Sequence, residues 1–222
     1  MSPRYIAIEG PKGCGKSTLL QRLPQRLRDY GLRVAMLCPT RPIPEPHPLE
    51  RLAVGCDDDA LRERLYAARS NYHARRVTQD AELILGDRSI LTSYATRWDR
   101  APAGQKRQHI ERVNALENLI GLPDHVIQLN VPDAQLLTRL QVRHGRDYGK
   151  YDETPARLRS VLTAYREMRE CGRELGLGSI VWHDIDADAP PAVVLARVVV
   201  RILGVLGLSS SKPQGPRLAC RG

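Results

Sequence analysis

The chain has 222 residues, a length typical of one globular domain with a single hydrophobic core. Hydrophobic residues make up 42% of it and charged residues 27%, which excludes a chain that is disordered throughout. The formal net charge of +9 suits an anionic partner, but aromatic residues reach only 5% and no basic run is interleaved with them. The composition therefore favours a small phosphate-rich ligand and does not indicate nucleic-acid binding.

No apolar stretch is long and uncharged enough to suggest a membrane span. The strongest candidate, AVVLARVVVRILGVLGL, contains Arg197 and Arg201 and is predicted to be a buried helix. The five cysteines lack C-x-x-C and Cys/His spacing, which favours reduced thiols. No N-terminal targeting pattern precedes the first apolar run at Tyr5, so we expect a cytoplasmic protein.

Apolar runs alternate with helical segments along the chain. The predicted strands are RYIAIEG (4–10), RVAMLCPT (33–40), AELILGDR (81–88), DHVIQLNV (124–131) and SIVWHDIDA (179–187). The predicted helices lie over about 16–30, 58–78, 90–98 and 105–120, from about 132, over about 154–175, and over the final apolar segment.

Nearly continuous apolar strands that alternate with helices are typical of a parallel sheet covered on both faces. We therefore predict an α/β fold of three layers with a five-stranded parallel sheet. One domain would cover residues 1–208, and residues 209–222 would form a disordered tail.

A phosphate-binding motif follows the first predicted strand. The residues GPKGCGKS (10–17) match G-x-x-x-x-G-K-[ST] between a strand and a helix, the context that this motif needs. Its glycines let backbone N–H groups face an anion at the start of the helix. Lys16 would reach the β- and γ-phosphates of ATP, and the Ser17 hydroxyl would bind Mg²⁺. The predicted ATP-binding residues are Gly10, Lys12, Gly13, Cys14, Gly15, Lys16, Ser17 and Thr18.

Charged residues end the third predicted strand. In GDRS (86–89), Asp87 and Arg88 would lie at the carboxyl edge of the sheet, where ligands of such sheets bind. Asp87 could hold a Mg²⁺-bound water or position an acceptor, and Arg88 could clamp a phosphate with two hydrogen bonds. The alternative is an aspartate that caps a helix beside a surface arginine.

Two further segments bring positive charge towards the same edge. Arg41 follows the second predicted strand in PTRP (39–42). In LYAARSNYHARR (65–76), Tyr66, Arg69 and His73 are about one helical turn apart and share one face. An amphipathic core helix is the alternative for this second segment.

An arginine-rich loop is predicted as a lid over about residues 143–153. Arg139, Arg143 and Arg146 surround a glycine-containing stretch between two predicted helices. Mobile arginines that close over a γ-phosphate would stabilise developing charge and exclude water. A solvated charged face is the alternative.

The order of these motifs resembles the thymidylate kinase family and the related deoxynucleoside kinases. IEGPKGCGKST is similar to the family's E-G-x-x-G-x-G-K-[ST], and PTRPIPEPHPLERL to its T-R-E-P-G segment. LYAARSNYH resembles its arginine-bearing helix, and ILGDRSILTSYAT its D-R-[YH]-x-x-S-x-x-A-Y. PDHVIQLNVPDAQLLTRLQVRHGRD resembles the run into its lid, so the similarity covers most of residues 4–207.

This resemblance implies a P-loop kinase that transfers the γ-phosphoryl group of ATP, with Mg²⁺, to a nucleoside monophosphate, and it implies a homodimer. The residues implied to be catalytic are Lys16, Asp87, Arg88, Arg143 and Arg146. Those implied to bind the acceptor are Arg41, Tyr66, Arg69, Arg88, Thr92 and Thr96, with Arg88 on its phosphate and Tyr66 stacked on its base. Ser17 and Asp87 would hold the metal.

Departures from the family pattern concern the acceptor. Lys12 stands where many thymidylate kinases carry an acid that contacts the acceptor's sugar, and a lysine cannot accept a hydrogen bond. Thr96 replaces a tyrosine that lies near the sugar. TRPIPEP lacks E-P-G, and RDYGKYDE in the predicted lid lacks D-R-x-E.

The sequence therefore predicts the reaction type and leaves the acceptor open. The candidates are dTMP or a related or modified pyrimidine nucleotide, an uncharged deoxynucleoside, and a specialised nucleotide-like metabolite. A deoxynucleoside kinase would need a carboxylate after the second strand, where Glu45 is the candidate, whereas Arg41 there favours an acceptor that already carries phosphate. A P-loop ATPase or nucleotide-binding module without kinase activity is the remaining alternative.

Overall fold

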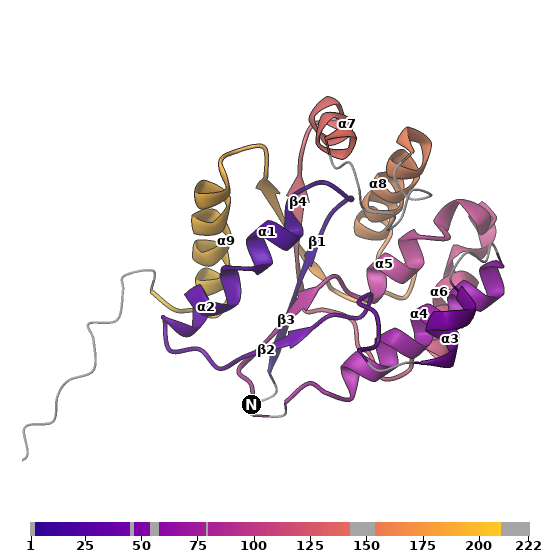
Figure 1. The fold of residues 1–222 in the computed structure, drawn as a ribbon, viewed down its shortest axis with the longest axis horizontal. Helices are drawn as coiled ribbons and strands as arrows, with labels where there is room; N and C mark the ends of the chain where they lie inside the picture. Colours follow the sequence, from indigo (N-terminus) through magenta and orange to yellow (C-terminus); the bar gives the residue numbers. More distant parts are fainter. Residues whose placement is uncertain (1–2, 45–46, 54–57, 79, 143–153, 210–222) are drawn as a thin grey trace, which may run out of the picture.

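The structure is a computed structural model that describes residues 3–44, 47–53, 58–78, 80–142 and 154–209. Within these residues one parallel five-stranded sheet has the order β2-β3-β1-β4-β5, with helices on both faces (Figure 1). The strands are β1 (Arg4–Glu9), β2 (Val34–Leu37), β3 (Leu83–Asp87), β4 (His125–Asn130) and β5 (Val181–Asp186). The predicted α/β fold and its five parallel strands are confirmed.

The described helices agree with most of the predicted segments. They are α1 (Lys16–Leu20), α2 (Leu23–Arg28), α3 (Pro48–Ala53), α4 (Asp59–Ala74), α5 (Ile90–Ala95), α6 (Lys106–Leu116), α7 (Asp133–Gln141), α8 (Pro155–Glu170) and α9 (Pro191–Val205). Two 3₁₀ helices, η1 (Trp98–Arg100) and η2 (Ala103–Gln105), connect α5 to α6. Asp58 caps α4 by accepting the N–H groups of Ala60 and Leu61, at distances of 2.8 and 3.3 Å.

One predicted helix is divided in the structure, and one helix was not predicted. The segment from 16 to 30 forms α1 and α2 instead of one helix, because Pro24 lacks an N–H and its ring would clash with the carbonyl one turn earlier. Proline is tolerated in a first helical turn, where Pro24 lies in α2. The proline-rich segment after β2 also contains the unpredicted helix α3, which begins at Pro48.

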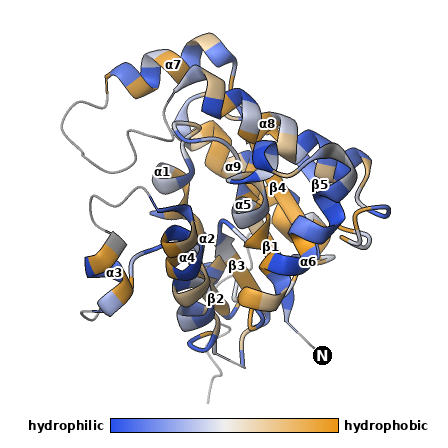
Figure 2. Ribbon diagram, turned by 90° about the vertical axis from the view of Figure 1, so that its right-hand side faces the viewer, coloured by the Kyte–Doolittle hydropathy of each residue, from blue (hydrophilic) through white to orange (hydrophobic). Residues whose placement is uncertain are grey.

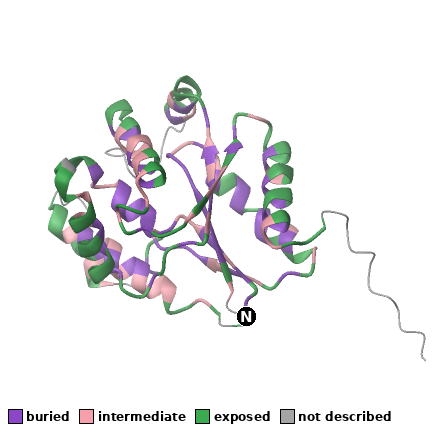
Figure 3. Ribbon diagram, turned by 180° about the vertical axis from the view of Figure 1, so that it is seen from behind, coloured by how far each residue is buried: buried purple, intermediate pink, exposed green. Residues whose placement is uncertain are grey.

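The alternation of side chains along β1 divides the core into two halves. Ile6 and Ile8 pack with α1, α2 and α9 on one face of the sheet. Tyr5 and Ala7 pack with α5, α6 and α8 on the other. Apolar strands lie between the helical layers in Figure 2, and buried residues follow the strands and the inner helix faces in Figure 3. The sheet is thereby fixed from both sides, and the loops at its carboxyl edge are left to form a site.

The apolar C-terminal segment is a helix that packs on the sheet, as predicted. Val198 and Ile202 of α9 are fully buried in the first half of the core, whereas Arg197 and Arg201 are exposed. Among the described residues, none of the helices has both the length and the apolar character that a membrane crossing requires.

Two stacked histidines on β4 and β5 predict a pH-dependent stability. The rings of His125 and His183 lie 5.3 Å apart, with a hydrogen bond of 3.1 Å between Nδ1 and Nε2. Burial lowers the pKa of both; Arg4 lowers that of His125 further and Arg201 that of His183, against opposing effects of Asp124 and Asp184.

Because the folded pKa values lie below the unfolded value of about 6.5, the unfolded chain binds more protons as the pH falls through that value. The histidines' contribution to stability is therefore complete above about pH 6.5 and decreases below it. We expect the thermal unfolding midpoint to fall between pH 7.5 and pH 5.5 in the wild type, and to fall less in His183→Asn. An equal fall in both proteins would contradict this assignment.

Candidate active site

The loop between β1 and α1 has the backbone shape of an anion-binding loop. Gly10, Gly13 and Gly15 have φ values of 140°, 91° and 100°. A Cβ atom on Gly10 would lie 2.8 Å from the carbonyl oxygen of Leu129 on the neighbouring strand β4. Glycine is thus required here both by the backbone conformation and by the close approach of β4.

Lys16 lies inside this loop. Its side chain is only 7% exposed, and its ammonium group donates hydrogen bonds to the carbonyl oxygens of Gly10 and Pro11, at 2.6 and 2.9 Å. Burial, and then the nearby Arg88, lowers the pKa of Lys16. The ammonium group is therefore a partly desolvated cation in the centre of the loop, where a bound phosphate would gain strongly from it.

Asp87 at the end of β3 holds Arg41 from the loop after β2. Arg41 donates to Asp87 Oδ2 from Nη2 at 2.9 Å and from Nε at 3.2 Å. The alternative role of Asp87 as a helix cap is wrong, because Ser89 caps α5 by accepting the N–H of Leu91. Asp87 and Arg41 thus meet at the carboxyl edge of the sheet, as their positions after two neighbouring strands predict.

Arg88 has an unusual backbone conformation. Its φ is 73°, the only positive value for a non-glycine residue among those described. Its carbonyl oxygen folds over Gly86, where a Cβ atom would lie 2.6 Å away, so the preceding turn depends on glycine. The guanidinium donates from Nη1 to the hydroxyl of Thr92 in α5 at 3.3 Å.

Arg69 in α4 is bound by a carboxylate that the sequence did not indicate. Its Nη2 and Nε donate to the two oxygens of Glu50 in α3, at 2.5 and 2.7 Å, and hydrogen bonding from Arg69 lowers the pKa of Glu50. The Tyr66 ring lies between two guanidinium groups, with Arg69 5.7 Å and Arg97 5.9 Å from its centroid. His73, predicted on the same face, contacts the carbonyl oxygen of Arg41 at 3.1 Å.

A cavity of about 500 Å³ brings most of the predicted site residues together. It extends from the phosphate loop to the carboxyl ends of β2 and β3 and to α8. The predicted residues on its wall are Lys12, Gly13, Gly15, Lys16, Ser17, Arg41, Tyr66, Arg69, Asp87, Arg88, Thr92 and Thr96. Unpredicted neighbours include Ala95, Leu158, Val161 and Tyr165.

A second cavity, of about 480 Å³, lies on the other side of the loop. Cys14 and Thr18 line it, together with Thr138 of α7 and Ala187 and Pro191 near the start of α9. Arg139 also lines it, and its guanidinium is held by the carbonyl oxygen of Ala187 and by Asp188. Gly10 lies at the base of the loop between the two cavities and is not among the lining residues of either.

The predicted lid over 143–153, including Arg143 and Arg146, lies outside the described residues, as does Glu45. The tail is described only at Ser209. Arg139, grouped with the lid arginines in the sequence, belongs to α7 and to the second cavity.

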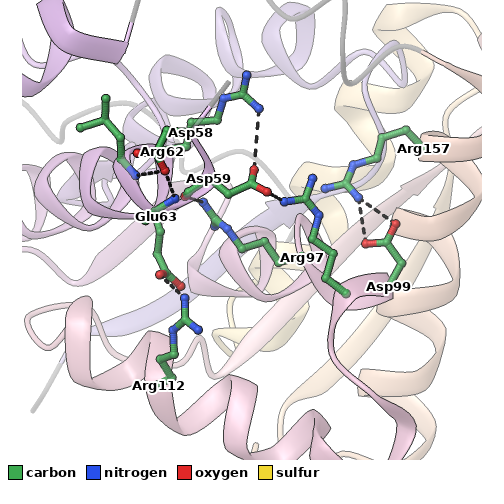
Figure 4. Close-up of polar contacts among 11 residues, drawn as sticks. Asp58, Asp59, Arg62, Glu63, Arg97, Asp99, Arg112 and Arg157 are labelled. Atoms are coloured by element: carbon green, nitrogen blue, oxygen red, sulfur yellow. Dashed lines mark hydrogen bonds and ion pairs between the residues drawn. The ribbon is translucent and has the colours of Figure 1, made fainter. Parts of the chain in front are cut away.

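Ion pairs tie together the helices around the first cavity (Figure 4). Arg157 at the start of α8 donates to both oxygens of Asp99 in η1, at 3.0 and 3.2 Å. Glu63 in α4 pairs with Arg112 in α6. These pairs connect α8 to η1 and α4 to α6.

A glycine-lined anion loop with a buried lysine, at the centre of a parallel sheet with helices on both faces, defines the P-loop NTPase fold. The cavity beside the loop adds three arginines, Arg41, Arg69 and Arg88, to this arrangement. A comparison with protein-family models finds no match.

Similarity to individual curated proteins points to one family. The chain is 27% identical over 217 residues to the thymidylate kinase of Pseudomonas entomophila, a match that covers 93% of this chain and 98% of the relative. It is 29% identical over 215 residues to the thymidylate kinase of Pseudomonas putida strain GB-1, covering 89% and 100%. It is 28% identical over 169 residues to the probable thymidylate kinase of Sulfurisphaera tokodaii, covering 75% and 82%. The chain is thus similar, over three quarters or more of its length, to these three proteins, which are named as thymidylate kinases or a probable one.

Proposed function

We propose that this protein transfers the γ-phosphoryl group of ATP to a nucleoside monophosphate, with dTMP or a related or modified pyrimidine nucleotide as the acceptor. One observation carries the proposal: Lys16 and Ser17 of the phosphate loop share a cavity with three arginines, Arg41, Arg69 and Arg88. Phosphoryl transfer needs positioned phosphates and neutralised charge more than it needs covalent chemistry. The cavity supplies both.

On the donor side, the loop N–H groups and Lys16 would hold the β- and γ-phosphates. Ser17 and Asp87 line the same cavity with a hydroxyl and a carboxylate, the oxygen ligands that Mg²⁺ takes when phosphates complete its shell. They therefore fit the ion, which would supply charge neutralisation at the phosphates. The second cavity, beside Thr18 and Arg139, would receive the nucleoside of ATP.

On the acceptor side, Arg88 would bind the acceptor phosphate, with Arg69 and Arg41 near the acceptor. Tyr66 would stack on the base, and Thr92 and Thr96 offer hydroxyl groups to the acceptor. Arg143 and Arg146 would approach the γ-phosphate from the lid. A homodimer in the cytoplasm completes the proposal, and light scattering of the purified protein tests the dimer.

A deoxynucleoside kinase is the nearest rival, and the charges in the cavity disfavour it. An uncharged acceptor needs a carboxylate to take the proton of its hydroxyl group. Among the described residues that line the first cavity, the carboxylate is Asp87, which pairs with Arg41 at 2.9 Å and is assigned above to Mg²⁺, not to proton transfer. Arg69 and Arg88, which line the same cavity, suit an acceptor that carries its own phosphate.

An acceptor screen tests the proposal. ADP release from ATP is measured with each nucleoside and each nucleoside 5′-monophosphate in turn, with a blank that lacks acceptor. We expect release to depend on a monophosphate, highest with a pyrimidine. Release at the same rate in the blank would instead identify an ATPase, and release only with nucleosides would identify the rival.

Lys12 is expected to shape the choice of acceptor. It lines the acceptor cavity from the phosphate loop, at the position where many thymidylate kinases carry an acid. If it replaces a group that reads the sugar hydroxyl, Lys12→Asp should raise kcat/KM for dTMP by about tenfold, roughly the value of one hydrogen bond to a charged group. The matched control is Lys12→Ala, which removes the positive charge without adding a group that can accept a hydrogen bond. No gain in Lys12→Asp over Lys12→Ala would show that Lys12 does not determine sugar recognition.

A further inference from the structure

Strand β1 ends in a buried carboxylate that the proposed transfer does not use. Glu9 is 0% exposed. Its Oε1 accepts hydrogen bonds from the N–H and the hydroxyl of Ser89, both at 2.7 Å. Its Oε2 accepts from the hydroxyls of Thr92 and Tyr165, at 3.0 and 2.7 Å. One carboxylate thereby joins β1 to the turn after β3, to α5 and to α8.

This arrangement is a costly way to stabilise a core. Removing a carboxylate from water costs several kcal/mol, and its replacement by a well-packed apolar residue is often neutral or stabilising. The other positions of β1 on the same face, Tyr5 and Ala7, are buried in the second half of the core. The presence of Glu9 at the last position of β1 therefore indicates a functional role at the carboxyl edge of the sheet.

The backbone of Arg88 is the part of that edge which most needs support. A positive φ is sterically disfavoured in a residue with a Cβ atom. The Arg88 N–H bonds to the carbonyl oxygen of Ile8 at 3.2 Å, and the next N–H, that of Ser89, bonds to Glu9 at 2.7 Å. The end of β1 thus holds the strained turn from both sides, through one backbone oxygen and one carboxylate.

The side chain of Arg88 is connected to the same carboxylate through the hydroxyl of Thr92. Its Nη1 donates to the Thr92 hydroxyl at 3.3 Å, and that hydroxyl donates to Glu9 Oε2 at 3.0 Å. Thr92 and Arg88 line the acceptor cavity, whereas Glu9 lies behind them. A single buried group is therefore connected to both the backbone and the guanidinium of Arg88.

We propose that Glu9 is a positioning residue for Arg88: its buried carboxylate fixes the strained turn and, through Thr92, the direction in which the guanidinium meets the acceptor phosphate. The inference rests on the proposed function, since it assigns Arg88 to the acceptor. A displacement of about 1 Å in such a group can cost up to a hundredfold in rate. Glu9 thus acts on the reaction without touching the substrate.

Three variants separate positioning from stability. Glu9→Ala removes both carboxylate oxygens that accept the hydrogen bonds. Glu9→Gln keeps the shape of the side chain and one carbonyl oxygen that can accept from Ser89. Glu63→Ala is the matched control, because Glu63 is also a buried glutamate, 9% exposed, but pairs with Arg112 (Figure 4) and does not line the cavity. If Glu9→Ala does not fold, Thr92→Val replaces it, since it removes only the hydroxyl between Glu9 and Arg88.

The first readout does not depend on activity. In protein labelled with ¹⁵N-arginine, the Nε–Hε resonance of Arg88 is assigned by its loss in Arg88→Ala. We expect this resonance to shift or broaden in Glu9→Ala, or in its Thr92→Val replacement, to recover towards the wild type in Glu9→Gln, and to stay unchanged in Glu63→Ala. An unchanged resonance without the Glu9–Thr92 connection overturns the proposal, whether or not the protein proves to be a nucleotide kinase.

The second readout is a double-mutant cycle with the monophosphate that the wild type phosphorylates best. Glu9→Ala should lower kcat/KM for that acceptor about 10- to 100-fold while the affinity for ADP with Mg²⁺ changes less than about twofold. In an Arg88→Ala background the same change should have little further effect, because Glu9 acts through Arg88. Equal losses in both backgrounds overturn the proposal. A wild type that uses no monophosphate contradicts the proposed function instead.

Discussion

Lys16→Ala is expected to abolish phosphoryl transfer while the protein stays folded. The Lys16 ammonium is buried in the phosphate loop, with two backbone carbonyls as partners, where its charge acts on a bound phosphate with little screening by water. Loss of one such preorganised group typically lowers kcat by about 10²–10³-fold. Turnover is measured by coupled ADP release at saturating acceptor.

The control for this variant is Lys106→Ala. The Lys106 ammonium also donates to a backbone carbonyl, that of Trp98, and lies 5.0 Å from the centre of the Trp98 ring. It therefore has a comparable structural role but does not line either of the two cavities described above. We expect normal turnover in Lys106→Ala. Near-normal turnover in Lys16→Ala, with an unfolding midpoint like that of the wild type, would show that the phosphate loop does not take part in the reaction.

Arg88→Ala is expected to lower kcat/KM for the acceptor and to leave nucleotide binding at the donor site nearly unchanged. Arg88 lies at the end of β3, in the cavity on the acceptor side of the loop. The substitution leaves backbone strain unchanged, because alanine and arginine both carry a Cβ atom at the φ of 73°. We expect kcat/KM for the acceptor to fall about a hundredfold or more, by an increase in KM, a decrease in kcat, or both.

The donor side is measured separately in the same variant, by calorimetric binding of ADP with Mg²⁺. Its affinity should stay within about twofold of the wild type. Arg112→Ala provides the control, since Arg112 is an ion-paired arginine on α6 that does not line the cavity. Equal losses of ADP and acceptor affinity in Arg88→Ala would place Arg88 at the donor phosphates.

The sequence predicted those parts of the site that depend on local structure. The loop at 10–17 is contiguous, and its glycines are required by its own backbone shape. Asp87 and Arg41 each follow a buried strand, so the parallel sheet alone brings them to one edge, where they pair although 46 positions apart. The helix predicted from about residue 58 begins there, because Asp58 caps α4.

The residues that the sequence did not reveal depend on tertiary packing. Glu50 binds Arg69 only because α3 folds against α4, and its proline-rich surroundings gave no helical signal. Glu9 was visible as an acid at the end of an apolar strand, but its partners come from positions 80 to 156 residues away. Arg97 contacts Tyr66 from beyond the end of α5. The break at Pro24 could have been predicted from the proline itself.

The central claim is that the cavity beside the phosphate loop receives a nucleoside monophosphate. The most direct test is ³¹P NMR of wild-type protein with ATP, Mg²⁺ and one monophosphate, using the best acceptor from the screen. We expect the γ-phosphate signal of ATP to disappear as the signals of ADP and of a second nucleoside diphosphate grow in equal amounts. Growth of ADP together with inorganic phosphate, at a rate independent of the monophosphate, would contradict it.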